Sequence, residues 1–232
     1  MNDKTNKVLY RKCKNKNLSL HHVCEVGVYL PQTSNIIDFI NDNIRTTLVE
    51  PDPKNIKAIH EFFKNRTNIT LYPIAIFEYN GMLQLVQREA STYVGSLEAS
   101  PALINDHYVP NEEDKFDVEC KKFDEIDDGS IDLLSVDTEG CEWYVLKNIK
   151  SQPKVISIET HGKLYINPFY TEISSWIKMN DYTTWYKDNS DTVYFKKGLF
   201  TITFKEKLSL NLKNFKLAFR RLKYQIKRKI SY

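Results

Sequence analysis

The chain has 232 residues, of which 41% are apolar and 27% charged, and its net charge is +3. This composition argues against disorder, and the length suits one sizeable α/β domain rather than two. The four cysteines form no CxxC pair, no stretch approaches the apolar length of a membrane span, and the start has no apolar signal-peptide core. The sequence therefore predicts unpaired thiols and a cytoplasmic domain.

Charge is distributed unevenly along the chain. Residues 205–232 carry ten lysines and arginines against one acid, Glu206, so that this segment has a charge of +9 and the rest of the chain one of −6. Residues 1–20 are also basic. An acidic body with basic ends predicts contact with a polyanion, either a membrane surface or a nucleic acid.

Short apolar runs alternate with helical patterns, as in parallel βαβ units. Asn80-Gly81 predicts a tight hairpin between the runs on either side. Residues 88–114 lack periodicity and predict a long functional loop, and residues 116–121 alternate like an edge strand. The expected strands are 22–26, 46–50, 69–77, 82–86, 116–121, 131–136, 155–159, 182–187 and 193–196.

These elements divide the chain into three parts. Residues 1–20 form a basic N-terminal segment, residues 21–200 the α/β domain, and residues 201–232 a basic amphipathic C-terminal helix. The predicted fold is a doubly wound α/β sheet, mostly parallel with an antiparallel last strand, in which Pro31 opens the first crossover helix. In such sheets ligands bind outside the carboxyl ends of the strands.

The first candidate site follows the first strand. The glycine in Glu25-Val26-Gly27 allows a sharp turn beside a ligand, and the helix N-terminus beyond it favours a carboxylate. Tyr29 and Gln32 occupy the later glycine positions of a dinucleotide fingerprint, where a pyrophosphate would clash. S-adenosylmethionine has no phosphate and tolerates this change. The alternative is an ordinary strand-to-helix turn.

Acidic residues follow the next buried strands. Glu50 lies 23 residues after Gly27, close to the spacing of about 20 for an acid that binds ribose hydroxyls; the alternative is a solvated strand-end acid. The strand 131–136 delivers Asp137 and Glu139 to the same edge, where two acids need cations, hydroxyls or a metal beside them. Their alternative role is to cap a helix.

Polar residues near this edge are candidates for contact with a substrate. Glu159 closes the strand 155–159. His161 follows it, and histidine suits a base that takes a proton from a substrate hydroxyl, because its unperturbed pKa lies near neutrality. A structural histidine is the alternative. Ser96 and His107 lie in the predicted long loop, and we expect them to contact the substrate.

Several of these motifs together resemble FkbM-type methyltransferases, over about residues 22–196. In that family the first motif usually reads Asp-x-Gly-Ala-Asn-x-Gly, whereas this chain has Glu-Val-Gly-Val-Tyr-Leu-Pro. The motifs that carry the resemblance are Val-Glu-Pro at 49–51, Ala75 in Pro-Ile-Ala-Ile, Asn-Gly at 80–81, Ile-Asp-Leu-Leu-Ser-Val-Asp-Thr-Glu-Gly at 131–140, Val-Leu-Lys at 145–147 and Ile-Ser-Ile-Glu at 156–159.

The resemblance implies a Rossmann-like fold, S-adenosylmethionine as the cofactor, and methylation of a hydroxyl oxygen, commonly on sugars or polyketide-like metabolites. It implies that Glu50 holds the ribose of the cofactor and that Asp137 and Glu139 line the cleft near the transferred methyl. Glu25 and Gly27 would flank the amino-acid part of the cofactor. The implied cofactor-binding residues are Glu25, Gly27, Glu50, Pro51, Ala75 and Asp137.

The leading interpretation is an O-methyltransferase that acts on a sugar hydroxyl of a glycan or glycolipid. The substrate oxygen would displace the sulfonium methyl in line, accelerated mainly by alignment. A base, either His161 or one of Asp137 and Glu139, would add about 10²–10⁴-fold. No ligand spacing demands a metal.

Two other functions stay open. A nucleic-acid methyltransferase would explain the basic ends, but the chain lacks an Asn-Pro-Pro-Tyr or Pro-Cys signature. A non-catalytic, membrane-associated interaction module is favoured by the altered first motif.

The C-terminal segment carries an apolar stripe at helical spacing, with basic residues on its other faces. We expect this stripe to pack on the body or on a second subunit, or to lie in an anionic membrane interface; contact with nucleic acid is disfavoured. Membrane docking would bring the protein to the inner face of a membrane, close to lipid-linked glycan precursors. The stripe comprises Leu208, Leu212, Phe215, Phe219, Leu222, Ile226 and Ile230.

Overall fold

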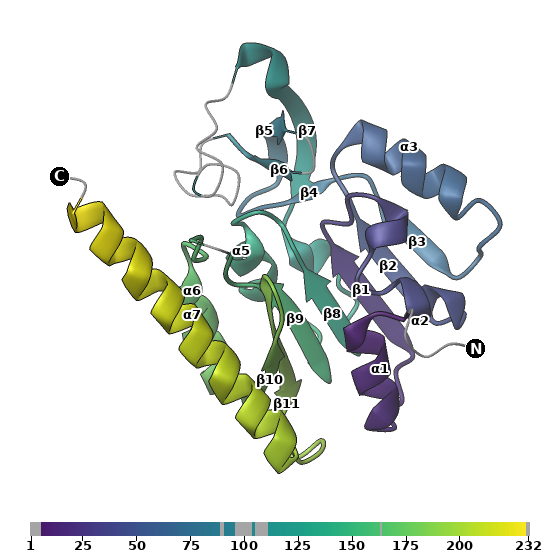
Figure 1. The fold of residues 1–232 in the computed structure, drawn as a ribbon. Helices are drawn as coiled ribbons and strands as arrows, with labels where there is room; N and C mark the ends of the chain where they lie inside the picture. The colour runs from purple at the N-terminus through teal and green to yellow at the C-terminus, as the bar shows by residue number, and fades with distance from the viewer. Residues whose placement is uncertain (1–5, 89–90, 96–103, 105–110, 163, 231–232) are drawn as a thin grey trace.

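The computed structural model describes residues 6–88, 91–95, 104, 111–162 and 164–230 (Figure 1). Its main sheet has seven strands in the order β10-β11-β9-β8-β1-β2-β3, and neighbouring strands are parallel except where β11 pairs with β9 and β10. This confirms the predicted sheet with its antiparallel last strand. The strands are β1 (His22–Val26), β2 (Arg45–Val49), β3 (Ile69–Tyr72), β8 (Leu133–Val136), β9 (Val155–Glu159), β10 (Tyr182–Lys187) and β11 (Asp191–Lys196).

Helices cover both faces of this sheet, so that β1, β8 and β9 are buried along their whole length. On one face, α1 (Val8–Asn15), α2 (Ile37–Asn41) and α3 (Pro53–Phe62) contribute to a single apolar cluster with the strands. On the other face, α5 (Glu142–Leu146) and α6 (Tyr170–Met179) do the same. The doubly wound arrangement is therefore confirmed.

A second sheet, which the sequence patterns did not predict, contains four strands in the order β4-β7-β5-β6. It lies at one end of the main sheet (Figure 1), and its strands β5 and β6 contribute residues to a cavity at the carboxyl ends of the main strands. The strands are β4 (Ala75–Ile76), β5 (Gly81–Arg88), β6 (Ser91–Val94) and β7 (Lys115–Lys121).

Four predictions for this region are wrong. The run 69–77 breaks at Pro73, which has no amide to donate, and consequently β3 pairs with β2 while β4 pairs with β7. The strand after Asn80-Gly81 pairs with β6 and β7, so there is no hairpin with the run before it. β7 lies inside the sheet instead of at its edge, and β6 occupies part of the predicted loop 88–114.

The helix predicted to open at Pro31 is also interrupted. A short 3₁₀ turn, η1 (Pro31–Thr33), precedes α2. Between them the Ser34 hydroxyl accepts the amide of Ile36 at 3.2 Å and donates to the Glu25 carboxylate at 2.5 Å. Ser34 thus ends one turn, starts the next, and holds this connection against β1.

The last helix, α7 (Phe204–Ile230), is fixed at its first turn. Thr203 and Glu206 form a capping box, in which each amide donates to the other side chain, at 2.8 and 3.2 Å. The Glu206 carboxylate also accepts Nε1 of Trp185 at 2.8 Å and Nζ of Lys16 at 2.9 Å. These bonds join α7 to β10, which lies beside it in Figure 1, and to Lys16 at the end of α1.

The predicted apolar stripe of α7 faces solvent. Its members Leu208, Leu212, Phe215, Phe219 and Leu222 are 49–69% exposed, and packing of these side chains on the body is therefore excluded; the side chains of the last two stripe residues are not described. Within the described part of the chain, no helix combines the length and apolarity needed to cross a membrane.

Candidate functional site

The turn after β1 requires a glycine. Gly27 has a φ of +82°, and a Cβ at this position would lie 1.8 Å from the carbonyl oxygen of Asp137. The Gly27 amide donates to the Val49 carbonyl at 2.9 Å, and the Asp137 amide donates to the Val26 carbonyl at 2.9 Å. The ends of β1, β2 and β8 thus converge on a position that has no room for a side chain.

Glu50 holds the loop that follows this turn. Its side chain is buried, at 3% exposure. Oε2 accepts the amides of Val28 and Tyr29 at 3.0 and 2.9 Å, while Oε1 accepts the Asp52 amide at 3.0 Å and Nδ2 of Asn55 at 3.3 Å. Burial raises the pKa of Glu50 against the opposing effect of these donors. Glu50 therefore has a positioning role, and its contact with a ribose stays a prediction.

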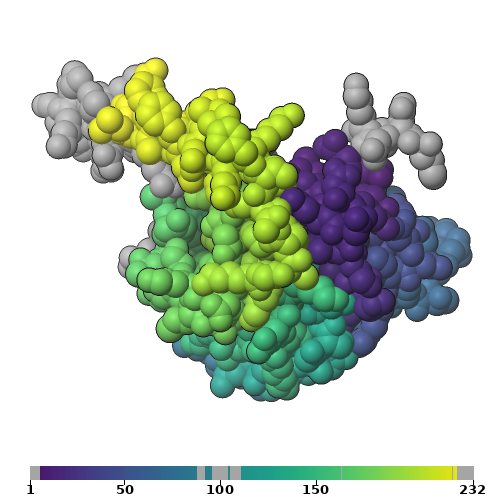
Figure 2. All heavy atoms as spheres, turned by 90° about the horizontal axis from the view of Figure 1, so that it is seen from below, coloured from purple at the N-terminus to yellow at the C-terminus, as the bar shows by residue number. Residues whose placement is uncertain are grey.

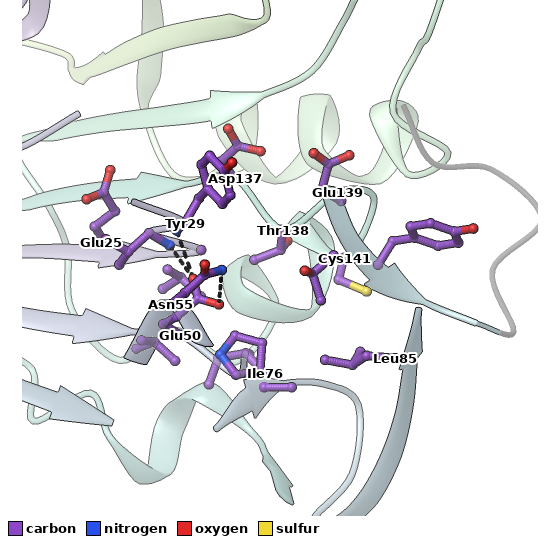
Figure 3. Close-up of a pocket in the computed structure, with 18 of the residues that line it drawn as sticks. Glu25, Tyr29, Glu50, Asn55, Ile76, Leu85, Asp137, Thr138, Glu139 and Cys141 are labelled. Carbon is purple, nitrogen blue, oxygen red and sulfur yellow. Dashed lines mark hydrogen bonds between the residues drawn. The ribbon is translucent and has the colours of Figure 1, made fainter. Parts of the chain in front are cut away.

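A cavity of about 270 Å³ lies between the carboxyl edge of the main sheet and the strands β5 and β6. Thr138 and Cys141, from the loop after β8, also line this cavity (Figure 3). The predicted residues that line it are Glu25, Gly27, Glu50, Pro51, Ala75, Asp137 and Glu139. The sheet edge expected to bind a ligand is therefore the one that carries the cavity.

The cavity has an acidic side and an apolar side. In Figure 3 the carboxylates of Glu25, Asp137 and Glu139 lie along one side, and Ile76 and Leu85 lie opposite them. Such a lining fits a ligand with positive charge at one end and a flat apolar group at the other.

Burial sets the protonation of the acidic side. Glu25 accepts the Ser34 hydroxyl at 2.5 Å and the Asn35 amide at 2.8 Å, yet desolvation raises its pKa to about 7. Desolvation, followed by the charge of Glu139, raises the pKa of Asp137 well above its usual range. Because the ionised carboxyls are destabilised here, a cationic ligand would be favoured.

The Glu25→Gln variant is expected to change how stability depends on pH. The pKa of Glu25 is raised on folding, from 4.5 to about 7, so the native state holds a proton that the unfolded state releases. Wild-type stability should fall as pH rises from about 4.5 to about 7, by up to about 3 kcal/mol from this group. Melting temperatures at pH 5 and pH 8 measure the effect. Identical pH slopes for the two proteins would contradict it.

A set of carboxylates lies behind the acidic side. Oxygen atoms of Asp137, Glu142 and Glu159 all lie within 4.8 Å of one another. Glu142 accepts the amides of Thr138 and Gly140 at 2.8 and 3.2 Å, which orders the turn after β8. An all-oxygen set of this kind could hold a hard divalent cation. Sequence spacing did not reveal it because the third carboxylate comes from the next strand.

The remaining candidates lie away from the cavity lining or outside the described residues. His161 is 1% exposed and its Nδ1 lies 3.0 Å from Oγ1 of Thr160. Glu159 is 7% exposed, and neither His161 nor Glu159 is among the residues that line the cavity. Ser96 and His107 lie outside the described residues. The roles of these four residues stay predictions.

Some lining residues were missed by the sequence patterns. Asn35, Asn55 and Thr138 line the cavity. A signal existed for Asn55, because Asp52 caps α3 through the Lys54 amide at 2.8 Å and Asn55 therefore lies in the first turn, directed back at the strand end. No comparable signal marked Asn35, because its position at the cavity results from the break between η1 and α2, which the sequence patterns did not predict.

Together, a doubly wound sheet with one antiparallel strand, a glycine turn after β1 and an acid-lined cavity at the carboxyl edge define a Rossmann-like methyltransferase fold. The family model described as Methyltransferase FkbM domain matches residues 25–184. The chain belongs to this family of methyltransferases, and membership implies S-adenosylmethionine as the methyl donor.

Solved structures are similar to this chain at low sequence identity. "A putative caffeoyl-CoA O-methyltransferase" from Staphylococcus aureus is 11% identical, with 84% of each chain covered and a TM-score of 0.50, which shows the fold alone. A ribosomal protein L11 methylase from Lactobacillus delbrueckii subsp. bulgaricus is 11% identical, with 79% of this chain and 74% of the other covered and a TM-score of 0.41. No curated protein matches the chain.

Proposed function

We propose that this protein transfers a methyl group from S-adenosylmethionine to a hydroxyl oxygen of a sugar in a glycan or glycolipid. The observation that carries the proposal is the cavity at the carboxyl edge of the main sheet. The turn at Gly27 and the buried side chain of Glu50, which accepts two amides of the following loop, shape one end of it. Carboxylates line one side of the cavity and apolar side chains line the other. S-adenosylmethionine supplies an electrophilic methyl on a sulfonium.

The lining of the cavity suits this donor. Its ammonium and sulfonium groups are cations, which the carboxyls of Glu25 and Asp137 would attract. Val49, Ile74 and Ile76 would pack against the adenine. The alternative, a degenerate and non-catalytic module, rests on the altered glycine motif after β1. The conformation of that motif in the structure tests this alternative.

Tyr29 occupies the position where the family usually has asparagine, and it adopts a left-handed conformation with φ +55°. Asparagine adopts this conformation readily, whereas an aromatic residue is strained by about 1–2 kcal/mol. The two amides donated to Glu50 hold the loop in this shape. The loop is thus retained despite the altered sequence, which favours an active enzyme over a degenerate module.

Asp137 is the carboxylate best suited to receive the proton of the acceptor hydroxyl. It lines the cavity, and its raised pKa makes its ionised form a stronger base than an ordinary aspartate. The neighbouring carboxylate of Glu139 would accept hydrogen bonds from other hydroxyls of a sugar. Product release would then return the proton to solvent.

Asp137→Asn is expected to lower kcat by about 10²–10⁴-fold, because the amide cannot accept the proton. The measurement is transfer of labelled methyl to a panel of glycans, lipid-linked sugars and polyketides. The transferred label should resist alkali as an ether does, which separates it from a carboxyl ester. Glu119→Gln, at a half-exposed position on β7, is the control and should keep full activity.

Other outcomes would contradict the proposal. Label in RNA or DNA in preference to carbohydrate would favour a nucleic-acid methyltransferase. Cofactor binding with no transfer to any acceptor class would favour the non-catalytic module.

A further inference from the structure

Helix α7 presents an exposed apolar stripe on the side away from the body. At 3.6 residues per turn, Phe204, Leu208, Phe215 and Leu222 fall on one face, and Leu217 lies roughly opposite them. Leu217 is buried at 7% exposure. Since Leu217 marks the side that packs inward, the stripe cannot serve the fold of this chain.

The stripe consists of large side chains. Phe204 is 81% exposed, Phe215 69% and Phe219 60%. The rings of Phe215 and Phe219 stack with centroids 6.4 Å apart and planes 19° apart, forming one aromatic surface. Leu212 and Leu222, each 53% exposed, continue it on either side. A continuous apolar surface of this kind marks a site of interaction.

Basic residues border the stripe. Lys205, Lys216 and Lys223 are exposed and follow one flank at helical spacing, and Lys207 lies on the other flank. The single acid of the segment, Glu206, is already engaged with Lys12 and Lys16 of the N-terminal segment at 3.5 and 2.9 Å. The positive charge of the segment 205–232 is therefore available to an anionic partner.

The helix extends beyond the strand on which it packs. β11 pairs antiparallel with β9 and so ends at the amino edge of the sheet, from which α7 returns along β10. Its 27 residues span about 40 Å, whereas the six-residue β10 spans about 20 Å. The second half of α7 therefore projects past the body toward the level of the cavity edge (Figures 1 and 2).

We propose that this face of α7 docks on an anionic lipid bilayer, with the apolar stripe in the acyl-headgroup interface and the flanking lysines on the lipid phosphates. Two copies of so basic a helix would repel each other side by side, which disfavours a dimer through this face. The backbone of a nucleic acid would attract the basic residues of α7, but its phosphates would leave the exposed phenylalanines of the stripe without an apolar partner.

This docking goes beyond the proposed methyl transfer and does not depend on it. Where both hold, docking would bring the enzyme to a surface that carries lipid-linked sugars. Vesicle binding without methyl transfer would leave the docking intact, and transfer to soluble sugars without vesicle binding would leave the enzyme intact.

The experiment is flotation of the full-length protein with vesicles of phosphatidylcholine alone or with 30% phosphatidylglycerol. Wild type should float with the anionic vesicles only. Phe215→Ser/Phe219→Ser should weaken binding at least tenfold, because two aromatic side chains no longer leave water, with an unchanged melting temperature. Met179→Ser is the matched control, since Met179 is 75% exposed on α6, and it should float as wild type does.

Three results would overturn the proposal. One is the absence of flotation at low ionic strength. Another is flotation that the double serine variant retains in full, because charge alone would then suffice, as it would for nucleic acid. The last is a concentration-dependent dimer that disappears in the double variant, which would make a second copy the occupant of the stripe.

Discussion

Replacement of Gly27 by alanine is expected to be the most damaging single change in the chain. The new Cβ would lie 1.8 Å from the Asp137 carbonyl oxygen, at a φ of +82°. Relief requires β1 and β8 to separate where Asp137 and Val26 share a hydrogen bond. The expected cost exceeds about 4 kcal/mol, a fall in melting temperature of more than about 8 °C, with loss of cofactor binding.

Gly198→Ala provides the matched control for this prediction. Gly198 has nearly the same conformation, with φ +83°, but no atom lies within 4 Å of the position of a Cβ. Its substitution should therefore cost only the conformational strain of about 1–2 kcal/mol and leave the cavity unchanged. Thermal melts of the two variants compare the effects. Equal losses of stability would show that the contact with Asp137 does not matter.

Glu50→Gln should have the second largest effect. Each carboxylate oxygen of Glu50 accepts hydrogen bonds from two donors. The glutamine side chain has only one oxygen, so its NH₂ group would face the two donors that the other oxygen now accepts. Two unsatisfied buried donors cost about 2–6 kcal/mol together, or at least about 5 °C in melting temperature. The loop carrying Tyr29 should loosen as a result, and affinity for S-adenosylmethionine should fall with it.

Glu25→Gln is the control for Glu50→Gln, because Glu25 is equally buried but its pKa of about 7 leaves its carboxyl about half protonated at pH 7. At pH 7 it should change the melting temperature much less. If Glu50→Gln melts like wild type and binds the cofactor equally well, Glu50 does not hold the loop.

The main sheet could be predicted from local patterns, because strands buried on both faces read as short, mainly apolar runs. The strand 131–136 and the strand 155–159 are of this type; Asp137 directly follows the first, and Glu159 ends the second. The parallel arrangement then brings those acids to one edge without further information. The residues of the cavity that follow strand ends, such as Asp137 and Glu50, were consequently found.

The rest depended on contacts between distant segments. The second sheet pairs Leu85 with Phe116 and Val94, and no local pattern encodes such a register. Asp191 lies opposite Glu159 because β11 returns antiparallel. It precedes the predicted strand 193–196, and no local pattern placed it beside this acid. The apolar stripe of α7 could be recognised in the sequence, but the sequence did not show which face of the helix packs inward. In the structure the buried Leu217 and the hydrogen bond from Trp185 to Glu206 fix that orientation.

The central claim is that the cavity at the carboxyl edge binds S-adenosylmethionine. Calorimetric titration of the folded protein with S-adenosylhomocysteine, the demethylated product of that cofactor, tests it most directly. The account predicts one binding site in wild type, unchanged in Gly198→Ala and lost in Gly27→Ala. An absence of binding to wild type, or equal binding to a folded Gly27→Ala protein, would contradict it.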